Sequence, residues 1–429
     1  MLSQKNLVLT FSYLFYLLPA ALITGPFLSD LIVTLLGFFF LIYTFKYQLW
    51  NYYNNYFTKF FLAFYLYLIT SSIWAADSLS SLKSSLPYIR FLLFSLAVVY
   101  LSKVNVNFYK SFFKFMLFTL VILILDAYVQ VIFGKNLFNQ SIYYLKDSYT
   151  QTMTTRVSGF FGSELILGSY ISRTIFVLLG VYIFCKKKIN NIYFIFLLTS
   201  AFIIVFLSGE RLSFFITIFC IVYILFQSKN LKKKISVFLL ILFSIIFLIT
   251  LTNTNVKNRM VVSTFAFLNS DFKNNSYTSP EKFVIFSPDH HELYVAAYKM
   301  FLEKPILGHG HNMYYENCGN FKRSVSSCST HPHNTLLQIA VENGVIGLLF
   351  LFIIYMYLII LFFRNLLEKN INRDKYFFFK ICLLSIISAN IFPFVTSGNF
   401  FNNWISIVYY LPVSLYLSIH MQKVDLKNE

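Results

Sequence analysis

The sequence is dominated by apolar runs, each about as long as a helix that crosses a membrane. The hydrocarbon core of a bilayer is about 30 Å thick, so a crossing helix needs about 20 apolar residues. Runs bounded by charges or turn-forming residues lie near 6–24, 27–45, 58–75, 86–102, 112–133, 165–185, 191–207, 212–227, 235–251, 335–363, 376–396 and 401–420. We therefore predict an all-α, polytopic integral membrane protein with about 12 transmembrane helices. An even number of crossings would place both chain ends on the same side.

The composition excludes a water-soluble globular protein and an intrinsically disordered chain. Of the 429 residues, 58% are hydrophobic and only 12% are charged, whereas soluble domains carry about 25% charged residues. An intrinsically disordered chain requires low hydrophobicity, so the high hydrophobic content excludes disorder as well. The first run follows a single cation, Lys5, and is followed by Gly25-Pro26 rather than by small residues, so we expect no cleavable signal peptide.

The net charge of +18 is concentrated on one side of the predicted membrane protein. With a cytoplasmic N-terminus, that side holds 20 of the 35 Lys and Arg residues but only four of the 17 acids. Short cytoplasmic loops are enriched in Lys and Arg. The distribution therefore predicts cytoplasmic N- and C-termini, and it argues against nucleic acid as a partner.

Two loops on the opposite, outer face are long. They cover residues 134–164 and 252–334, and the second holds six of the seven His residues. Loops of that length are usually functional. We therefore divide the chain into transmembrane helices 1–9 (residues 1–251), a large outer loop with the candidate site (252–334), and helices 10–12 with a cytoplasmic tail (335–429).

The outer loop also contains a predicted helix and a cysteine pair. Ser287-Pro288-Asp289 can cap the start of a helix over about 289–304, which has one apolar face. Cys318 and Cys328 are ten positions apart. In an oxidising compartment such a pair indicates a disulfide. Two free thiols, or zinc ligands together with nearby His residues, are the alternatives.

His331-Pro332-His333-Asn334 lies where the loop enters the run at 335–363. Proline fixes the entry geometry and Asn334 can cap the helix. Neutral imidazole can take a proton from a hydroxyl, so His333 is a candidate general base with His331 in support. An interfacial polar residue is the alternative for His333. The pairs 309/311 and 331/333 also permit a metal, but Glu316 is the one carboxylate close to either, and we expect none.

Three charged residues near the predicted spans require an explanation. Arg211 lies in Ser208-Gly209-Glu210-Arg211, a short turn on the outer face. Its fork of donors suits phosphate oxygens, although it could simply pair with Glu210. Arg259, just beyond the ninth run, is a second phosphate candidate. Glu342, inside the tenth run, could orient a basic residue or satisfy a neighbour.

Four motifs together resemble a known superfamily. They are Ser208-Gly209-Glu210-Arg211, Pro305-Ile306-Leu307-Gly308-His309-Gly310, Thr330-His331-Pro332-His333-Asn334 and Glu342-Asn343-Gly344-Val345-Ile346-Gly347-Leu348. Their order and the layout of the spans are similar to those of the O-antigen ligase and polymerase superfamily of bacterial envelope glycosyltransferases. The similarity covers about 190–363 by motif and the rest by hydropathy.

The resemblance implies glycan transfer from a polyprenyl pyrophosphate to a hydroxyl, without metal, nucleotide sugar or other cofactor. Arg211 and a second cation would stabilise the departing pyrophosphate, and His333 would act as base or orient the acceptor. Many members carry an Arg three residues before an aromatic on the loop helix, where this chain reads His291-Glu292-Leu293-Tyr294. We therefore prefer Arg259 as the second cation, with His291 as the alternative.

These features predict a multi-pass enzyme of the bacterial inner membrane with a periplasmic active site. We expect an O-antigen ligase-like enzyme that moves the glycan to the lipid A core, with membrane lipids around it. A polymerase acting on a growing glycan, and protein O-glycosylation, are alternatives of the same class. A transporter or flippase and a metal sensor are alternatives of other classes.

Overall fold

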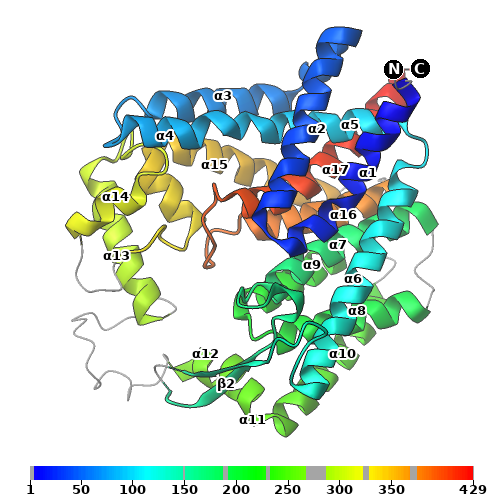
Figure 1. The fold of residues 1–429 in the computed structure, drawn as a ribbon, viewed down its shortest axis with the longest axis vertical. Helices are drawn as coiled ribbons and strands as arrows, with labels where there is room; N and C mark the ends of the chain where they lie inside the picture. Colours follow the sequence, from blue (N-terminus) through cyan, green and yellow to red (C-terminus); the bar gives the residue numbers. More distant parts are fainter. Residues whose placement is uncertain are drawn as a thin grey trace.

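The structure is a computed structural model and describes residues 4–147, 150–186, 192–228, 232–266, 287–321, 328–367 and 374–428. Within these ranges the chain is almost entirely helical, with a single two-stranded hairpin (Figure 1). The prediction of an all-α polytopic membrane protein is confirmed.

The structure contains helices from one end of the described chain to the other. They are α1 (Gln4–Thr24), α2 (Pro26–Tyr47), α3 (Tyr56–Ser71), α4 (Ser78–Ser85), α5 (Ile89–Val104), α6 (Phe108–Phe133), α7 (Leu167–Lys186), α8 (Ile192–Leu207), α9 (Arg211–Gln227), α10 (Lys232–Thr252), α11 (Thr254–Lys257), α12 (Ser263–Phe265), α13 (Pro288–Glu303), α14 (Tyr314–Cys318), α15 (Thr335–Leu367), α16 (Lys375–Asn390) and α17 (Asn403–Asn428).

Each of the twelve apolar runs overlaps a helix, but the number of crossings is not confirmed as twelve. Among the described residues, eight helices are long and apolar enough to cross a membrane: α1, α2, the continuous stretch Ser78–Val104, α6, α7, α10, α15 and α17. The other four, α3, α8, α9 and α16, have 16 or 17 residues. At 1.5 Å per residue they span roughly 24–26 Å, slightly less than the hydrocarbon core.

The helices differ widely in how far they are buried. In α7, 83% of the apolar stretch is buried, and the helix packs against α6, α8, α9 and α16. In α10 and α15 the buried shares are only 11% and 17%. Exposed apolar surface of that extent fits contact with lipid rather than with water.

A hairpin joins the two long loops. Strands β1 (Tyr143–Lys146) and β2 (Met153–Arg156) are antiparallel, and β2 packs against α11 and the π-helical turn η5 (Asn258–Val262). The base of the hairpin loop is fixed to α6, where Leu137 N–H donates to Asp126 Oδ1 at 2.9 Å and Gly159 N–H donates to Gln130 Oε1 at 2.8 Å.

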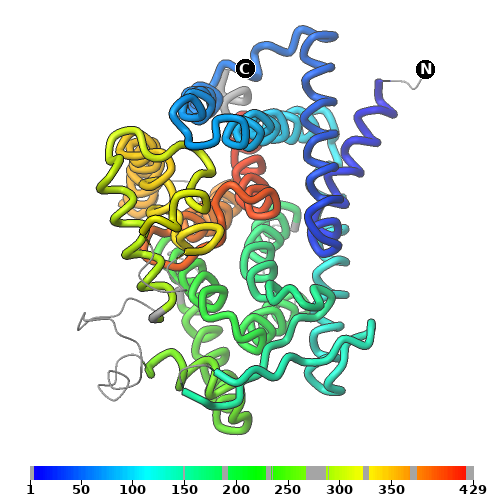
Figure 2. Tube along the Cα trace, turned by 60° about the vertical axis from the view of Figure 1, so that its left-hand side comes forward, coloured from blue at the N-terminus to red at the C-terminus, as the bar shows by residue number. Residues whose placement is uncertain are grey.

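The hairpin lies far from the chain ends. It lies with α11 and α12 at the end of the molecule opposite the start of α1 and the end of α17 (Figures 1 and 2).

A break in α15 connects the outer loop to the bundle. Gly344 has a φ of +61°, so the backbone leaves the helix there and frees N–H and C=O groups. Residues 305–310 pair with them: His309 N–H donates to Val341 C=O (2.9 Å), Gly310 N–H to Glu342 C=O (3.0 Å), and Val345 N–H to Pro305 C=O (2.8 Å). Two of the motifs that are separate in the sequence therefore bind each other.

Candidate functional site

His333 lies in the short segment between Cys328 and α15, on a constrained backbone. Its φ of +52° falls in the left-handed region, which is uncommon for residues other than glycine. Its carbonyl accepts a hydrogen bond from Ser397 N–H at 2.8 Å. This hydrogen bond ties His333 to the segment after α16.

Asn334 holds the start of α15 to a distant segment. Its Oδ1 accepts from Leu337 N–H at 3.0 Å, as a helix cap does. Its Nδ2 donates to the carbonyls of Pro393 and Val395, at 2.9 and 3.0 Å. The cap residue thus also positions residues 393–395 beside His333.

Three histidines gather at this point. The ring centroid of His333 lies 4.1 Å from that of His331 and 5.7 Å from that of His290. Burial lowers the pKa of all three. Burial and the proximity of His333 together bring the pKa of His290 and of His331 to about 4. At neutral pH the rings are therefore uncharged, and His333 is in the form that accepts a proton.

Sequence reasoning missed His290 and selected its neighbour His291. His290 lies in the first turn of α13, after the cap residue Ser287. Its ring contacts His333, and its electrostatic neighbours include Arg211. Consecutive residues of a helix point about 100° apart, so only one of two adjacent histidines can face the site. The sequence alone does not indicate which one.

The cap residue also contacts the ring of His290. Ser287 Oγ accepts from His290 N–H at 3.3 Å and lies 2.7 Å from His290 Nδ1. The hydroxyl can donate its proton to Nδ1 while its oxygen accepts from the backbone. We infer this arrangement, which leaves the ring proton on Nε2, where it can donate to an anion.

Three arginines lie in or beside the turn at 208–211. Arg211 begins α9, Arg259 lies in η5, and Arg156 ends β2. Each donates to a backbone carbonyl there or nearby: Arg211 Nη1 to Ser263 at 3.2 Å, Arg259 Nε to Gly209 at 3.1 Å, and Arg156 Nε to Ser208 at 3.3 Å. The charges that act on Arg211 are those of Arg259, Asp147 and Arg156.

Arg156 was not predicted. It belongs to the loop at 134–164, which has no motif that marks it as functional. The clue available in the sequence was that this loop lies on the same face as Arg211. Only the packing of β2 against η5 shows that Arg156 joins the other two arginines.

Glu210 does not neutralise Arg211. Its carboxylate accepts from Gly168 N–H at 2.7 Å and from Ser169 N–H at 2.9 Å, at the start of α7. Its ion-pair partner is Arg156, at 4.0 Å. Within the described ranges neither Arg211 nor Arg259 has a carboxylate at ion-pair distance. Asp147 acts electrostatically on both Arg211 and Arg259, so the three arginines are offset by two carboxylates and the group keeps excess positive charge. Forked guanidinium donors suit phosphate oxygens.

Glu342, at the break in α15, accepts hydrogen bonds from neighbouring residues. Its carboxylate accepts from Asn312 N–H at 3.1 Å and from Gln338 Nε2 at 3.3 Å. Gln338 in turn accepts from Phe400 N–H at 2.9 Å. Glu342 therefore holds the outer loop and the segment after α16 in place around the site.

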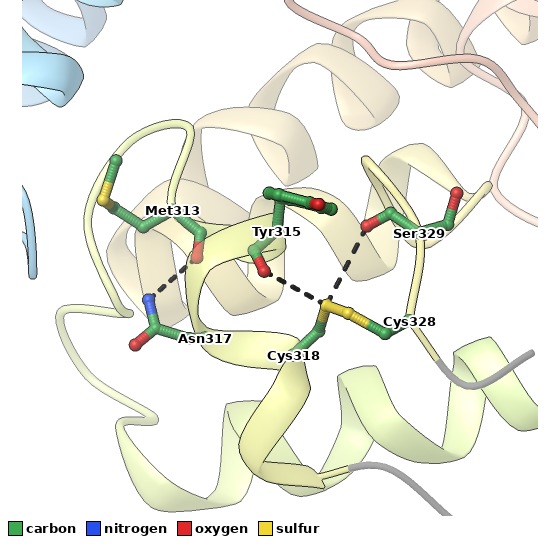
Figure 3. Close-up of a disulfide and its surroundings, with 6 residues drawn as sticks. All are labelled: Met313, Tyr315, Asn317, Cys318, Cys328 and Ser329. Carbon is green, nitrogen blue, oxygen red and sulfur yellow. Dashed lines mark hydrogen bonds between the residues drawn. A yellow bond between two sulfur atoms is a disulfide. The ribbon is translucent and has the colours of Figure 1, made fainter. Parts of the chain in front are cut away.

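Cys318 and Cys328 form a disulfide (Figure 3). Cys318 ends α14, and its sulfur lies 3.3 Å from the carbonyl oxygen of Tyr315. The bond ties the beginning of the segment that carries His333 to α14.

His309 and His311 lie apart from the other pair. His309 Nε2 lies 2.9 Å from the carbonyl oxygen of Met300, and His311 Nε2 lies 3.2 Å from Ser84 Oγ. Among the described residues, no group of three or more His, Cys, Asp or Glu side chains is arranged to hold a metal ion.

The histidines, Arg211 and Arg259 all fall within one stretch of the chain that has known relatives. Residues 194–352 match the O-antigen ligase family model. The resemblance found in the motifs is thereby confirmed. Arg156 lies outside the matched stretch.

One relative supports the same assignment. A stretch of 108 residues is 36% identical to a protein of Rickettsia conorii that carries the provisional name polysaccharide ligase. The alignment covers 23% of this chain and 26% of that protein, so this chain matches about a quarter of the relative's length.

Proposed function

We propose that this protein is a membrane glycosyltransferase of the O-antigen ligase type. It moves a polysaccharide from a polyprenyl pyrophosphate carrier to a hydroxyl of the lipid A core, at the periplasmic face of the bacterial inner membrane. The observation that carries the proposal is the contact between the rings of His290 and His333, together with the position of His290 within the electrostatic reach of Arg211. A neutral base and a group of cations suited to phosphate would then act on one substrate.

The reaction needs no oxidant or energy donor beyond the carrier itself. The acceptor oxygen attacks the anomeric carbon and forms the new glycosidic bond, while the bond from that carbon to the pyrophosphate breaks. His333 takes the proton of the acceptor hydroxyl. The pyrophosphate leaves with the bonding electrons, and its growing charge is stabilised by Arg211, Arg259 and the Nε2–H of His290.

The orientation of the protein rests on its charge pattern. The arginine group and the histidines belong to loops that the Lys and Arg distribution assigns to the outer side. The donor headgroup would therefore lie at the periplasmic surface, with its lipid tail in the bilayer. The cytoplasmic position of both termini is part of this proposal.

The decisive experiment is an electrophoretic profile of lipopolysaccharide from a deletion strain that carries either the wild-type gene or His333→Ala. Loss of all capped lipid A core, with long polymer retained on its carrier, supports the ligase. Core capped with a single repeat unit would support the polymerase instead. An unchanged profile with His333→Ala would remove His333 as base and favour a transporter or flippase.

A further inference from the structure

One face of α9 forms an apolar strip that begins at Arg211 and runs toward the C-terminal end of the helix. Residues Phe215, Phe219, Val222 and Phe226 follow Arg211 at intervals of three or four positions. At 100° per residue they lie with Arg211 in a sector about 80° wide. Phe215 is 40% exposed, Val222 37% and Phe226 48%, so none of the helices that the structure describes fully covers this face.

The strip is bordered by aromatic rings from the segment after α16. The ring of Phe392 lies 5.6 Å from that of Phe215 and 5.3 Å from that of Phe219. Phe394 lies 6.0 Å from Phe392 and is 76% exposed. The segment that carries these rings is the one that Asn334 holds next to His333.

Near the C-terminal end of α9, the strip is bordered by α15. There the ring of Tyr223 lies 5.0 Å from that of Phe362, and Gln227 Nε2 donates to the carbonyl of Phe362 at 3.0 Å. From Arg211 to Phe226 the strip extends over roughly 22 Å of helix. It is therefore long enough for several isoprene units.

This arrangement, together with the proposed function, leads to a specific site for the lipid tail. We propose that the polyprenyl chain of the donor lies along this α9 face, with Phe215, Phe219 and Phe392 around the units nearest to the pyrophosphate. A pyrophosphate bound at Arg211 must send its attached chain away from the cations into apolar surroundings. The strip begins at Arg211 and is apolar throughout.

The charge at one end of the strip distinguishes it from ordinary lipid-facing surface. Phe118 on α6 and Phe196 on α8 are even more exposed, at 67% and 73%. Neither helix begins at an arginine of the cluster. These two residues therefore provide a matched control pair.

The test compares two donors that carry the same glycan on a short or a long polyprenyl pyrophosphate. For Val222→Ala/Phe226→Ala, which removes side chains from the part of the strip that only a long tail reaches, the KM for the long-tailed donor should rise about tenfold. Its KM for the short-tailed donor and its kcat should change little. Phe118→Ala/Phe196→Ala should leave both KM values at those of the wild type. An unchanged KM for the long-tailed donor in the first variant would overturn the proposal.

A second measurement does not depend on transfer. A photoreactive phenylalanine analogue is placed at Val222, and polyprenyl pyrophosphate without a glycan is added. Cross-linking to the polyprenyl chain supports the site, even if the enzyme transfers no glycan and the proposed function fails. Cross-links only to phospholipid, or only to a second copy of the chain, would overturn it.

Discussion

His290 and His333 face each other with their ring centroids 5.7 Å apart, although one begins α13 and the other precedes α15. Burial lowers the pKa of His290, and the charges of His333 and Arg211 lower it further. His290 thus contacts the proposed base and lies within the electrostatic reach of the arginine group. Under the proposed function, its ring would help to hold the leaving group.

The first prediction concerns the two adjacent histidines. His290→Asn should lower kcat/KM for glycan transfer by about tenfold, because it removes one hydrogen bond to a charged group. His291→Asn should change it by less than about threefold. Both are measured with purified protein, normalised to the folded fraction. Equal losses in the two variants would argue that His290 has no special role.

The second prediction is the pH dependence of transfer. Burial lowers the pKa of His333 below its usual value near 6.5. The neutral, proton-accepting form therefore persists to lower pH, and activity is lost as the pH falls through the lowered value. The acid limb of kcat/KM should have its midpoint below about 6.5. A midpoint at or above that value would contradict a buried His333 as the base.

The third prediction separates the arginines. Arg211→Lys and Arg259→Lys should each reduce kcat/KM by about 100-fold, because lysine lacks the forked donors that meet a pyrophosphate in the transition state. Arg156→Lys should cost only about tenfold, since its guanidinium is already engaged by Glu210.

Arg90→Lys is the control for these substitutions, because Arg90 pairs with Asp30 at 3.0 Å and is not part of the cluster. Its kcat/KM should stay near that of the wild type. If the control loses as much activity as Arg211→Lys, the loss reflects general damage to the protein rather than phosphate binding.

The fourth prediction tests the break in α15. Gly344→Ala should lower the free energy of unfolding by about 3 kcal/mol or more, because φ is +61° there and a Cβ would meet the carbonyl of Ile306. Gly319→Ala should stay within about 0.5 kcal/mol, since nothing lies within 4 Å of its Cβ position. Thermal unfolding in detergent measures both. A Gly344 variant as stable as the Gly319 variant would refute the tight contact.

Several local features could be predicted because they depend on residues close together in the chain. All twelve apolar runs form helices, and α13 begins at Ser287-Pro288 as the cap chemistry indicates. Asn334 caps α15 for the same reason. Whether the helices of 16 or 17 residues cross the membrane could not be predicted, because run boundaries in the sequence are uncertain by several residues.

By itself, then, the sequence determined that this chain is helical and membrane-bound, and which stretches carry the chemistry. The tertiary structure decided which of these residues interact with one another. It engaged Glu210 with α7 and Arg156 instead of Arg211, and it turned His290 rather than His291 toward His333. The physical reason is that local propensity fixes each helix from its own residues. The site depends instead on hydrogen bonds and charges between segments far apart in the chain, and those arise only when the helices pack.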